Sequence, residues 1–319
     1  MSVLYKGEII DSNLTRNAKG GTEQMRSRLL QNIDKKYLEK VAIHFSRPEK
    51  LYDDVPNILY CHDLPDDPAV SLLHDSADRF ETFVFVSHWQ RDQFVSKFPK
   101  VTYAKSHVIP NAIETEFRRT EKPKDQINFI YHTTPHRGLQ LVYPIFDKLS
   151  EIHENIHLDV YSSFDVYGWK ERDKPYEKLF EDIAKHPKMT YHGAKENSEV
   201  IEALKKSHLF LYPCIWQETS CIALIEAMHC GVLPIYPSYS ALVETGSFSS
   251  NVGMHRFTED FSQLASISFQ SAHNLINRIN EDKQYVEETM NNCNSSLNPH
   301  SISYFRNKWE PLLRDIQER

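Results

Sequence analysis

The stretch from residue 208 to residue 236 constrains the fold of this 319-residue chain more than any other. It reads HLFLYPCIWQETSCIALIEAMHCGVLPIY. Residues 209–212 form a short apolar run that is typical of a buried strand. Residues 222–229 are a helical run, Gly231 stands where a helix would end in the left-handed conformation, and residues 232–236 are a second apolar run. Strand, helix and strand at this length predict a βαβ unit with a right-handed crossover, and therefore a parallel sheet.

The loop before that helix is the predicted ligand site. Ligands of open α/β sheets bind beyond the carboxyl ends of the strands, and residues 213–221 occupy that position. Glu218, Thr219 and Ser220 supply the acid and the capping residues expected at a helix start. Glu226 lies two turns into an apolar helix, where a carboxylate is costly without a partner. A lone helical glutamate usually pairs with a basic neighbour, but the spacing of the two acids favours a shared site.

The composition excludes several classes of protein. With 40% hydrophobic and 25% charged residues the chain is typical of a globular protein, and its length fits two domains. The net charge of -7 argues against general nucleic-acid binding. Five cysteines in no CxxC spacing predict reduced thiols and a cytoplasmic location. No apolar run of 18 residues and no signal-peptide pattern occur, so any membrane contact is expected to be peripheral.

Three further candidates lie at expected element ends. Gly20 and Gly21 precede a predicted helix, where glycines let backbone amides approach an anion, although an ordinary loop fits them equally well. His62 follows an expected strand over 57–61, a position where a histidine is more often structural than ligand-binding. Arg137 follows a strand that begins at Ile127 and leads into a helix. It is placed either to neutralise a diphosphate or to pair with a nearby acid, and each charge-assisted bond contributes about 1.5–3 kcal/mol.

These motifs together resemble the retaining glycosyltransferases of the GT-B fold, family 4, also called glycosyl transferases group 1. The family signature E-G-F-G-hhhh-E-A-h-A-x-G-x-P-h is similar to E-T-S-C-I-A-L-I-E-A-M-H-C-G-V-L-P-I here. Both acids, the Glu-Ala pair, Gly231 and Pro234 are kept, whereas two loop glycines are replaced by Thr219 and Cys221.

Three other segments extend the resemblance. Residues 20–23 are similar to the GG-[AST]-E motif near the donor phosphates, and residues 191–194 resemble the turn beside the nucleotide base. The G-R-h-x-x-x-K-G pattern is only partly kept, because His132 stands at the arginine position and Arg137 at the lysine position.

The resemblance implies an α/β architecture, the GT-B fold, in which two Rossmann-like domains with parallel sheets face an interdomain cleft. It implies an acceptor-side domain over 1–118 and a nucleotide-sugar-binding domain over 119–298. A final helix over 299–319 is expected to pack back on the first domain. The charged stretch 115–126, which contains Pro123, suits a linker.

The implied activity is retaining, metal-independent transfer of a hexosyl unit from a UDP- or GDP-sugar to a glycan, lipid-linked or other hydroxyl acceptor. The implied catalytic residues are Glu218 on the donor sugar hydroxyls, Arg137 on the diphosphate and His62 on the sugar. The implied donor-binding residues are Gly20, Gly21, Arg137, His192, Thr219, Ser220, Cys221 and Glu226, the last on the ribose. Because no Asp-x-Asp occurs, no metal or other cofactor is expected. No nucleic-acid partner is expected either.

Two alternatives differ in class. A nicotinamide oxidoreductase should show G-x-G-x-x-G after an early strand, and the sequence has none. A non-catalytic nucleotide-sugar-binding module of the same fold stays open, because His132, Thr219 and Cys221 depart from the catalytic pattern.

Overall fold

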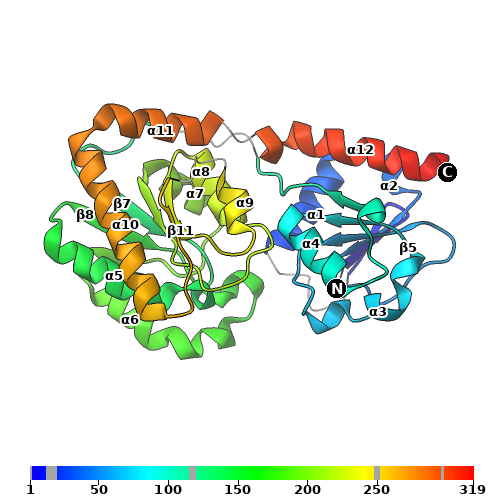
Figure 1. The fold of residues 1–319 in the computed structure, drawn as a ribbon, viewed down its shortest axis with the longest axis horizontal. Helices are drawn as coiled ribbons and strands as arrows, with labels where there is room; N and C mark the ends of the chain where they lie inside the picture. The colour runs from blue at the N-terminus through cyan, green and yellow to red at the C-terminus, as the bar shows by residue number, and fades with distance from the viewer. Residues whose placement is uncertain (1, 12–19, 115–119, 248–251, 296–297) are drawn as a thin grey trace. The chain divides into compact units, whose positions relative to one another are not determined.

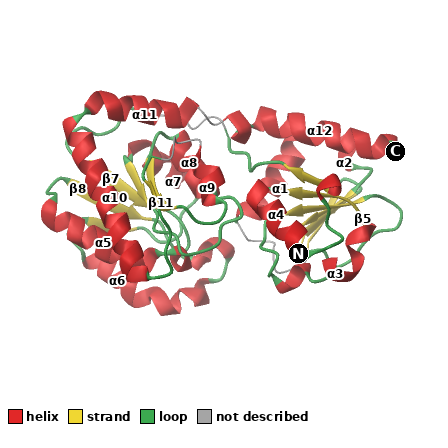
Figure 2. Cartoon of the chain, viewed as in Figure 1, coloured by secondary structure: helices red, strands yellow, loops and turns green. Residues whose placement is uncertain are grey.

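The computed structural model describes residues 2–11, 20–114, 120–247, 252–295 and 298–319. The chain packs as two units, Met1–Glu114 with Asn298–Arg319, and Thr115–Leu297. Each unit contains a sheet flanked by helices (Figures 1 and 2). Part of the expected linker, residues 115–119, lies outside the described residues.

The first unit, Met1–Glu114 with Asn298–Arg319, contains a six-stranded sheet in the order β2-β1-β3-β4-β5-β6. Its strands are β1 (Ser2–Tyr5), β2 (Glu8–Asp11), β3 (Ala42–Phe45), β4 (Asn57–Cys61), β5 (Phe80–Phe85) and β6 (Ser106–Val108). Strands β3 to β6 pair in parallel as predicted. The edge differs, because β1 is antiparallel to both β2 and β3. Lys6 and Gly7, with φ of 50° and 83°, form a two-residue hairpin turn that joins β1 to β2.

The helices of the first unit are α1 (Gly21–Asn32), α2 (Lys35–Leu38), α3 (Leu73–Ser76), α4 (His88–Lys97) and α12 (Ile302–Glu318). Residues 68–79 form α3 between two 3₁₀ turns, Pro68–Val70 and Ala77–Arg79. The last helix, α12, buries Phe305, Trp309 and Leu313 along one face. Its Gln317 Nε2 donates to the carbonyl oxygen of Tyr37 in α2 at 2.8 Å, so α12 packs within the first unit.

The second unit, Thr115–Leu297, contains a wholly parallel sheet in the order β12-β11-β10-β7-β8-β9. The strands are β7 (Ile127–Tyr131), β8 (Ile156–Val160), β9 (Met189–Tyr191), β10 (Leu209–Leu211), β11 (Leu233–Pro237) and β12 (Met254–His255). The helices are α5 (Leu139–Ile152), α6 (Glu177–Lys185), α7 (Asn197–Lys206), α8 (Ile222–His229), α9 (Leu242–Gly246), α10 (Phe261–Glu281) and α11 (Lys283–Ser295).

The predicted βαβ unit is β10, α8 and β11. Strands β10 and β11 pair in parallel, with Phe210 opposite Pro234. Gly231 has the predicted left-handed conformation, with φ of 68°, directly after α8. Both predictions from this stretch are confirmed.

One buried lysine holds two helix ends of the second unit. Lys122 Nζ donates to the carbonyl oxygens of Leu204 and Lys205, each at 3.1 Å, and to that of Cys230 at 2.8 Å. These carbonyls end α7 and α8, where the last turn of a helix has no partners of its own and carries partial negative charge. Lys122 therefore fixes the position of α8, the helix that carries Glu226.

None of the helices in the described ranges is long and apolar enough to cross a membrane.

Candidate functional site

The carboxyl edge of the second unit's sheet brings together loops from distant parts of the sequence. Four neighbouring strands, β10, β7, β8 and β9, run in parallel, so the loops that follow them lie at one edge. Arg137 follows β7, His192 follows β9, and residues 213–221 follow β10. The edge is therefore where the predicted donor residues of this unit collect.

Two of these loops touch through a glycine. Gly138 precedes α5 with φ of 126°, and a Cβ atom on it would lie 2.3 Å from the carbonyl oxygen of Pro213. The backbone N–H of Ile215 donates to the carbonyl oxygen of Arg137 at 3.3 Å. Only glycine fits position 138, because it alone allows both this conformation and this approach of the two backbones.

A buried ion pair joins the same two loops. Arg137 Nη1 bonds to Glu218 Oε1, and the Tyr212 hydroxyl donates to that oxygen at 2.6 Å. The side chains of Arg137 and Glu218 are 21% and 6% exposed. Burial alone lowers the pKa of the Arg137 guanidinium, but the Glu218 carboxylate more than offsets this and raises it well above its usual value. The site thus holds a fixed cation and a fixed anion in direct contact.

The predicted capping of α8 is wrong. The N-cap residue of α8 is Cys221, and its side chain makes no capping hydrogen bond. The Glu218 carboxylate is engaged by Arg137 and Tyr212 instead, and the Glu218 N–H donates to Ser240 Oγ at 2.9 Å. The backbone N–H groups at a helix start can bind an anion.

The second predicted acid, Glu226, is buried in α8 and is 3% exposed. Asn197 Nδ2, at the first residue of α7, donates to Glu226 Oε1 at 3.1 Å. His192 follows β9, where its Nε2 is 2.7 Å from Asp159 Oδ1 and its ring stacks on Tyr161 at 4.2 Å. Both side chains are therefore held in place by neighbouring polar groups.

The remaining predicted residues belong to the first unit. Gly20 is the N-cap of α1 and Gly21 is its first residue. His62 follows β4, and its backbone N–H donates to Ser46 Oγ at 2.8 Å. Burial lowers the pKa of His62 to about 3, so the imidazole is neutral near pH 7.

The sequence interpretation missed a group of buried polar atoms at the site edge. The group consists of four side-chain atoms without a hydrogen-bond partner in the part of the chain that the structure describes: His132 Nε2, Thr133 Oγ1, His136 Nδ1 and Ser162 Oγ. All four follow β7 or β8. Buried polar atoms are normally bonded, so this edge is suited to a polar ligand or to water. The polar pairs Thr133-Thr134 and Ser162-Ser163 directly after two strands were the available signal.

Burial also determines the charge at position 132. It lowers the pKa of His132 to about 3, so the side chain that replaces the family arginine is uncharged near neutral pH.

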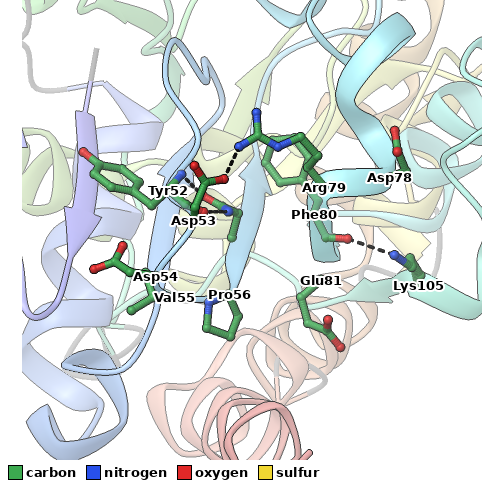
Figure 3. Close-up of a pocket in the computed structure, with 11 residues that line it drawn as sticks. Tyr52, Asp53, Asp54, Val55, Pro56, Asp78, Arg79, Phe80, Glu81 and Lys105 are labelled. Carbon is green, nitrogen blue, oxygen red and sulfur yellow. Dashed lines mark hydrogen bonds and ion pairs between the residues drawn. The ribbon is translucent and has the colours of Figure 1, made fainter.

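A hollow of about 510 Å³ lies elsewhere, in the first unit (Figure 3). It lies beside Asn57 and Phe80, at the amino ends of β4 and β5, away from the edge where ligands of such sheets bind. Arg79 pairs with Asp53 at 2.6 Å, and Lys105 Nζ donates to the Phe80 carbonyl at 3.0 Å. Since its cations are paired locally, this hollow is a weaker candidate than the second unit's edge.

The described ranges contain no group of three or more His, Cys, Asp or Glu side chains that could hold a metal ion. The absence of a metal from the reaction stays a prediction.

Comparisons with known proteins agree with the geometry. Residues 112–245 match the family model described as Glycosyl transferases group 1. A comparison with curated protein sequences gives no match.

Solved structures resemble the chain across both units. The HepE protein Alr3699 of Anabaena, crystallised with UDP-glucose, is 14% identical with a TM-score of 0.63, over 82% of this chain and 72% of that one. A glycosyltransferase of Rickettsia africae ESF-5 is 13% identical with a TM-score of 0.67, over 97% and 84%. The pneumococcal O-GlcNAc transferase GtfA, crystallised with UDP and GlcNAc, is 12% identical with a TM-score of 0.65, over 98% and 62%.

These findings confirm the predicted fold class and agree with the predicted family. Residues 112–245 match the family model of glycosyl transferases group 1, and the chain has the fold of the GT-B glycosyltransferases.

Proposed function

We propose that this protein transfers a hexosyl unit from a UDP- or GDP-sugar to a hydroxyl group of a glycan or lipid-linked acceptor, with retention of configuration and without a metal. The observation that carries the proposal is the contact of Arg137 with Glu218 at the sheet edge, inside the segment that matches the family model. Relatives of the same fold crystallised with UDP-glucose, or with UDP and GlcNAc, support a UDP-sugar as the donor.

In the proposed complex the donor diphosphate takes the place of the Glu218 carboxylate on Arg137. The start of α8, with Thr219, Ser220 and Cys221, supplies backbone amides to the same phosphates. Glu218, released from Arg137, accepts hydrogen bonds from the donor sugar hydroxyls. Glu226 and His192 take the ribose and base.

Catalysis in this proposal rests on the leaving phosphate. Negative charge develops there as the glycosidic bond breaks, and Arg137 together with the α8 amides stabilises it. The phosphate oxygen accepts the proton of the acceptor hydroxyl on the same face of the sugar, so no carboxylate nucleophile or side-chain base is needed.

A non-catalytic nucleotide-sugar-binding module is the second candidate. The observation in its favour is the neutral His132. The diphosphate then has the Arg137 guanidinium but no second cation at position 132. Binding without turnover would distinguish it from the enzyme.

Thermal unfolding against UDP-, GDP-, ADP- and CDP-sugars tests the donor site. A ligand at a hundred times its Kd stabilises the fold by about 2.7 kcal/mol. The stabilising nucleotide should lose its effect on Glu226→Ala and keep it on Glu202→Ala, a matched change at an exposed helical glutamate. NMR of the released sugar then reports its anomeric configuration. The absence of stabilisation by all four nucleotide sugars would contradict the proposal.

A further inference from the structure

One aromatic side chain of the site edge is exposed although it is rigidly supported. Trp216 is 43% exposed, in the loop between β10 and α8. Its ring meets His136 edge-on at 4.7 Å and 82°, and His136 in turn stacks on the buried Phe164 at 5.1 Å and 17°. The Cys214 thiol donates to the Trp216 carbonyl oxygen at 3.3 Å. The three rings come from the loops after β10, β7 and β8, so His136 supports the indole directly and Phe164 supports His136.

The support behind the indole is uncharged near neutral pH. Burial, followed by the charge of Arg137, lowers the pKa of His136 to about 4. Trp216 therefore rests on the neutral His136 ring while part of its apolar surface stays in water. Such exposure is unfavourable by about 25 cal/mol per Å², and a ligand that covers the ring recovers this free energy.

Trp216 and its supporting ring belong to the same two loops as the ion pair. His136 immediately precedes Arg137, and Trp216 stands two residues before Glu218 in the loop whose Pro213 contacts Gly138. These two loops thus supply both an apolar ring face and a carboxylate acceptor. A pyranose ring matches both, because it has a face of C–H groups and a rim of hydroxyls.

We infer that Trp216 is a stacking platform for a pyranose ring whose hydroxyls bond to Glu218. This rests on the proposed function, in which that sugar is a substrate. A nucleobase fits less well: His192 follows β9, whereas Trp216 follows β10, and these strands are at opposite ends of the row β10-β7-β8-β9. The same pyranose chemistry has two sources, the donor sugar and a glycan acceptor, and the experiment separates them.

The test compares the wild type with Trp216→Ala, Trp216→Phe and the control Phe261→Ala, which removes an exposed aromatic ring of α10. Calorimetry gives the Kd of UDP, GDP and their glucose, galactose, mannose and GlcNAc conjugates. Trp216→Ala should weaken the sugar-dependent part of binding about two- to tenfold, while the Kd of the bare nucleotide stays within about twofold. Trp216→Phe should restore part of the loss, and Phe261→Ala should change nothing.

The two sources give different results. A donor sugar on Trp216 raises the Kd of the nucleotide sugar, whereas an acceptor sugar raises the acceptor KM and leaves that Kd unchanged. Equal weakening of bare nucleotide and nucleotide sugar would assign the ring to the base and overturn the inference, as would no change in any constant.

Failure of the proposed function can be distinguished from failure of the inference about Trp216. If no nucleotide binds the wild type, that function fails, yet titration of the free monosaccharides still decides about the platform. A change in tryptophan fluorescence in the wild type that Trp216→Phe abolishes would support it, and no change in the wild type would overturn it.

Discussion

Arg137 and Glu218 are 81 residues apart in the sequence, and their buried ion pair joins the loops after two neighbouring strands, β7 and β10. A carboxylate is thus held where, in the proposed function, a phosphate binds. The pair stabilises the ligand-free site, and a phosphate must compete with Glu218 for the guanidinium.

Glu218→Gln keeps the shape of the side chain and removes its charge. We expect the free energy of unfolding without ligand to fall by about 1–3 kcal/mol, because the buried Arg137 loses its anionic partner. Addition of the cognate nucleoside diphosphate should recover more stability in the variant than in the wild type, since no carboxylate competes with the phosphate. Urea unfolding with and without the nucleotide measures both, with Glu202→Gln as control. Weaker protection of the variant would contradict phosphate binding at Arg137.

Gly138→Ala should disrupt the contact between the two loops. The positive φ and the approach of Pro213 to 2.3 Å of the new Cβ each cost about 1–3 kcal/mol, so we expect a loss of about 2–6 kcal/mol in unfolding free energy. Gly168→Ala is the matched control, because Gly168 also has positive φ, of 74°, but its Cβ would meet nothing within 4 Å. Denaturant unfolding of the two variants separates the clash from the conformational strain, and equal losses would show that the contact contributes little.

Lys122→Met should destabilise the second unit by about 2–4 kcal/mol, because three carbonyl groups at the ends of α7 and α8 lose a charged donor. Lys124→Met changes an exposed lysine two residues away and should stay within about 0.5 kcal/mol of the wild type. Thermal unfolding compares them. Similar melting temperatures for the two variants would argue against a structural role of Lys122.

The buried His132 predicts a loss of stability in acid. Its folded-state pKa of about 3 lies below the ordinary value of 6.5, so its neutral form is favoured in the folded state. This contribution is fully present above pH 6.5 and is lost as the pH falls toward 3, because the unfolded chain binds the proton first. Between pH 7 and pH 5 the loss is about 1–2 kcal/mol. His132→Phe should reduce the fall in unfolding free energy over this range by that amount, and an unchanged pH profile would contradict the assignment.

Local patterns in the sequence were sufficient for the central βαβ unit and for the parallel sheet that contains it. The apolar run at 209–212, the helical run at 222–229 and Gly231 each depend on neighbours in the chain, and the structure contains all three features. The edge hairpin of the first unit also had a local signal, because Lys6-Gly7 between two short apolar runs is typical of a tight turn.

The candidate site depended on contacts that no local pattern contains. Residues 218–220 have the composition of a helix cap, but the Glu218 carboxylate is engaged by Arg137 and Tyr212, and Cys221 takes the N-cap position. Tertiary partners thus outweighed the local preference. No local pattern around Trp216 indicates a binding role either, because the rings that support it, His136 and Phe164, come from two other loops.

The close fit of Gly138 against Pro213 also has an energetic consequence. Two backbones in direct contact are displaced together, so a ligand that shifts the loop after β7 also shifts the loop after β10. Affinity for one part of a donor molecule then depends on whether the other part is bound, and by thermodynamic reciprocity the dependence is equal in both directions. In the proposed function, the contact at position 138 therefore couples phosphate recognition to sugar recognition.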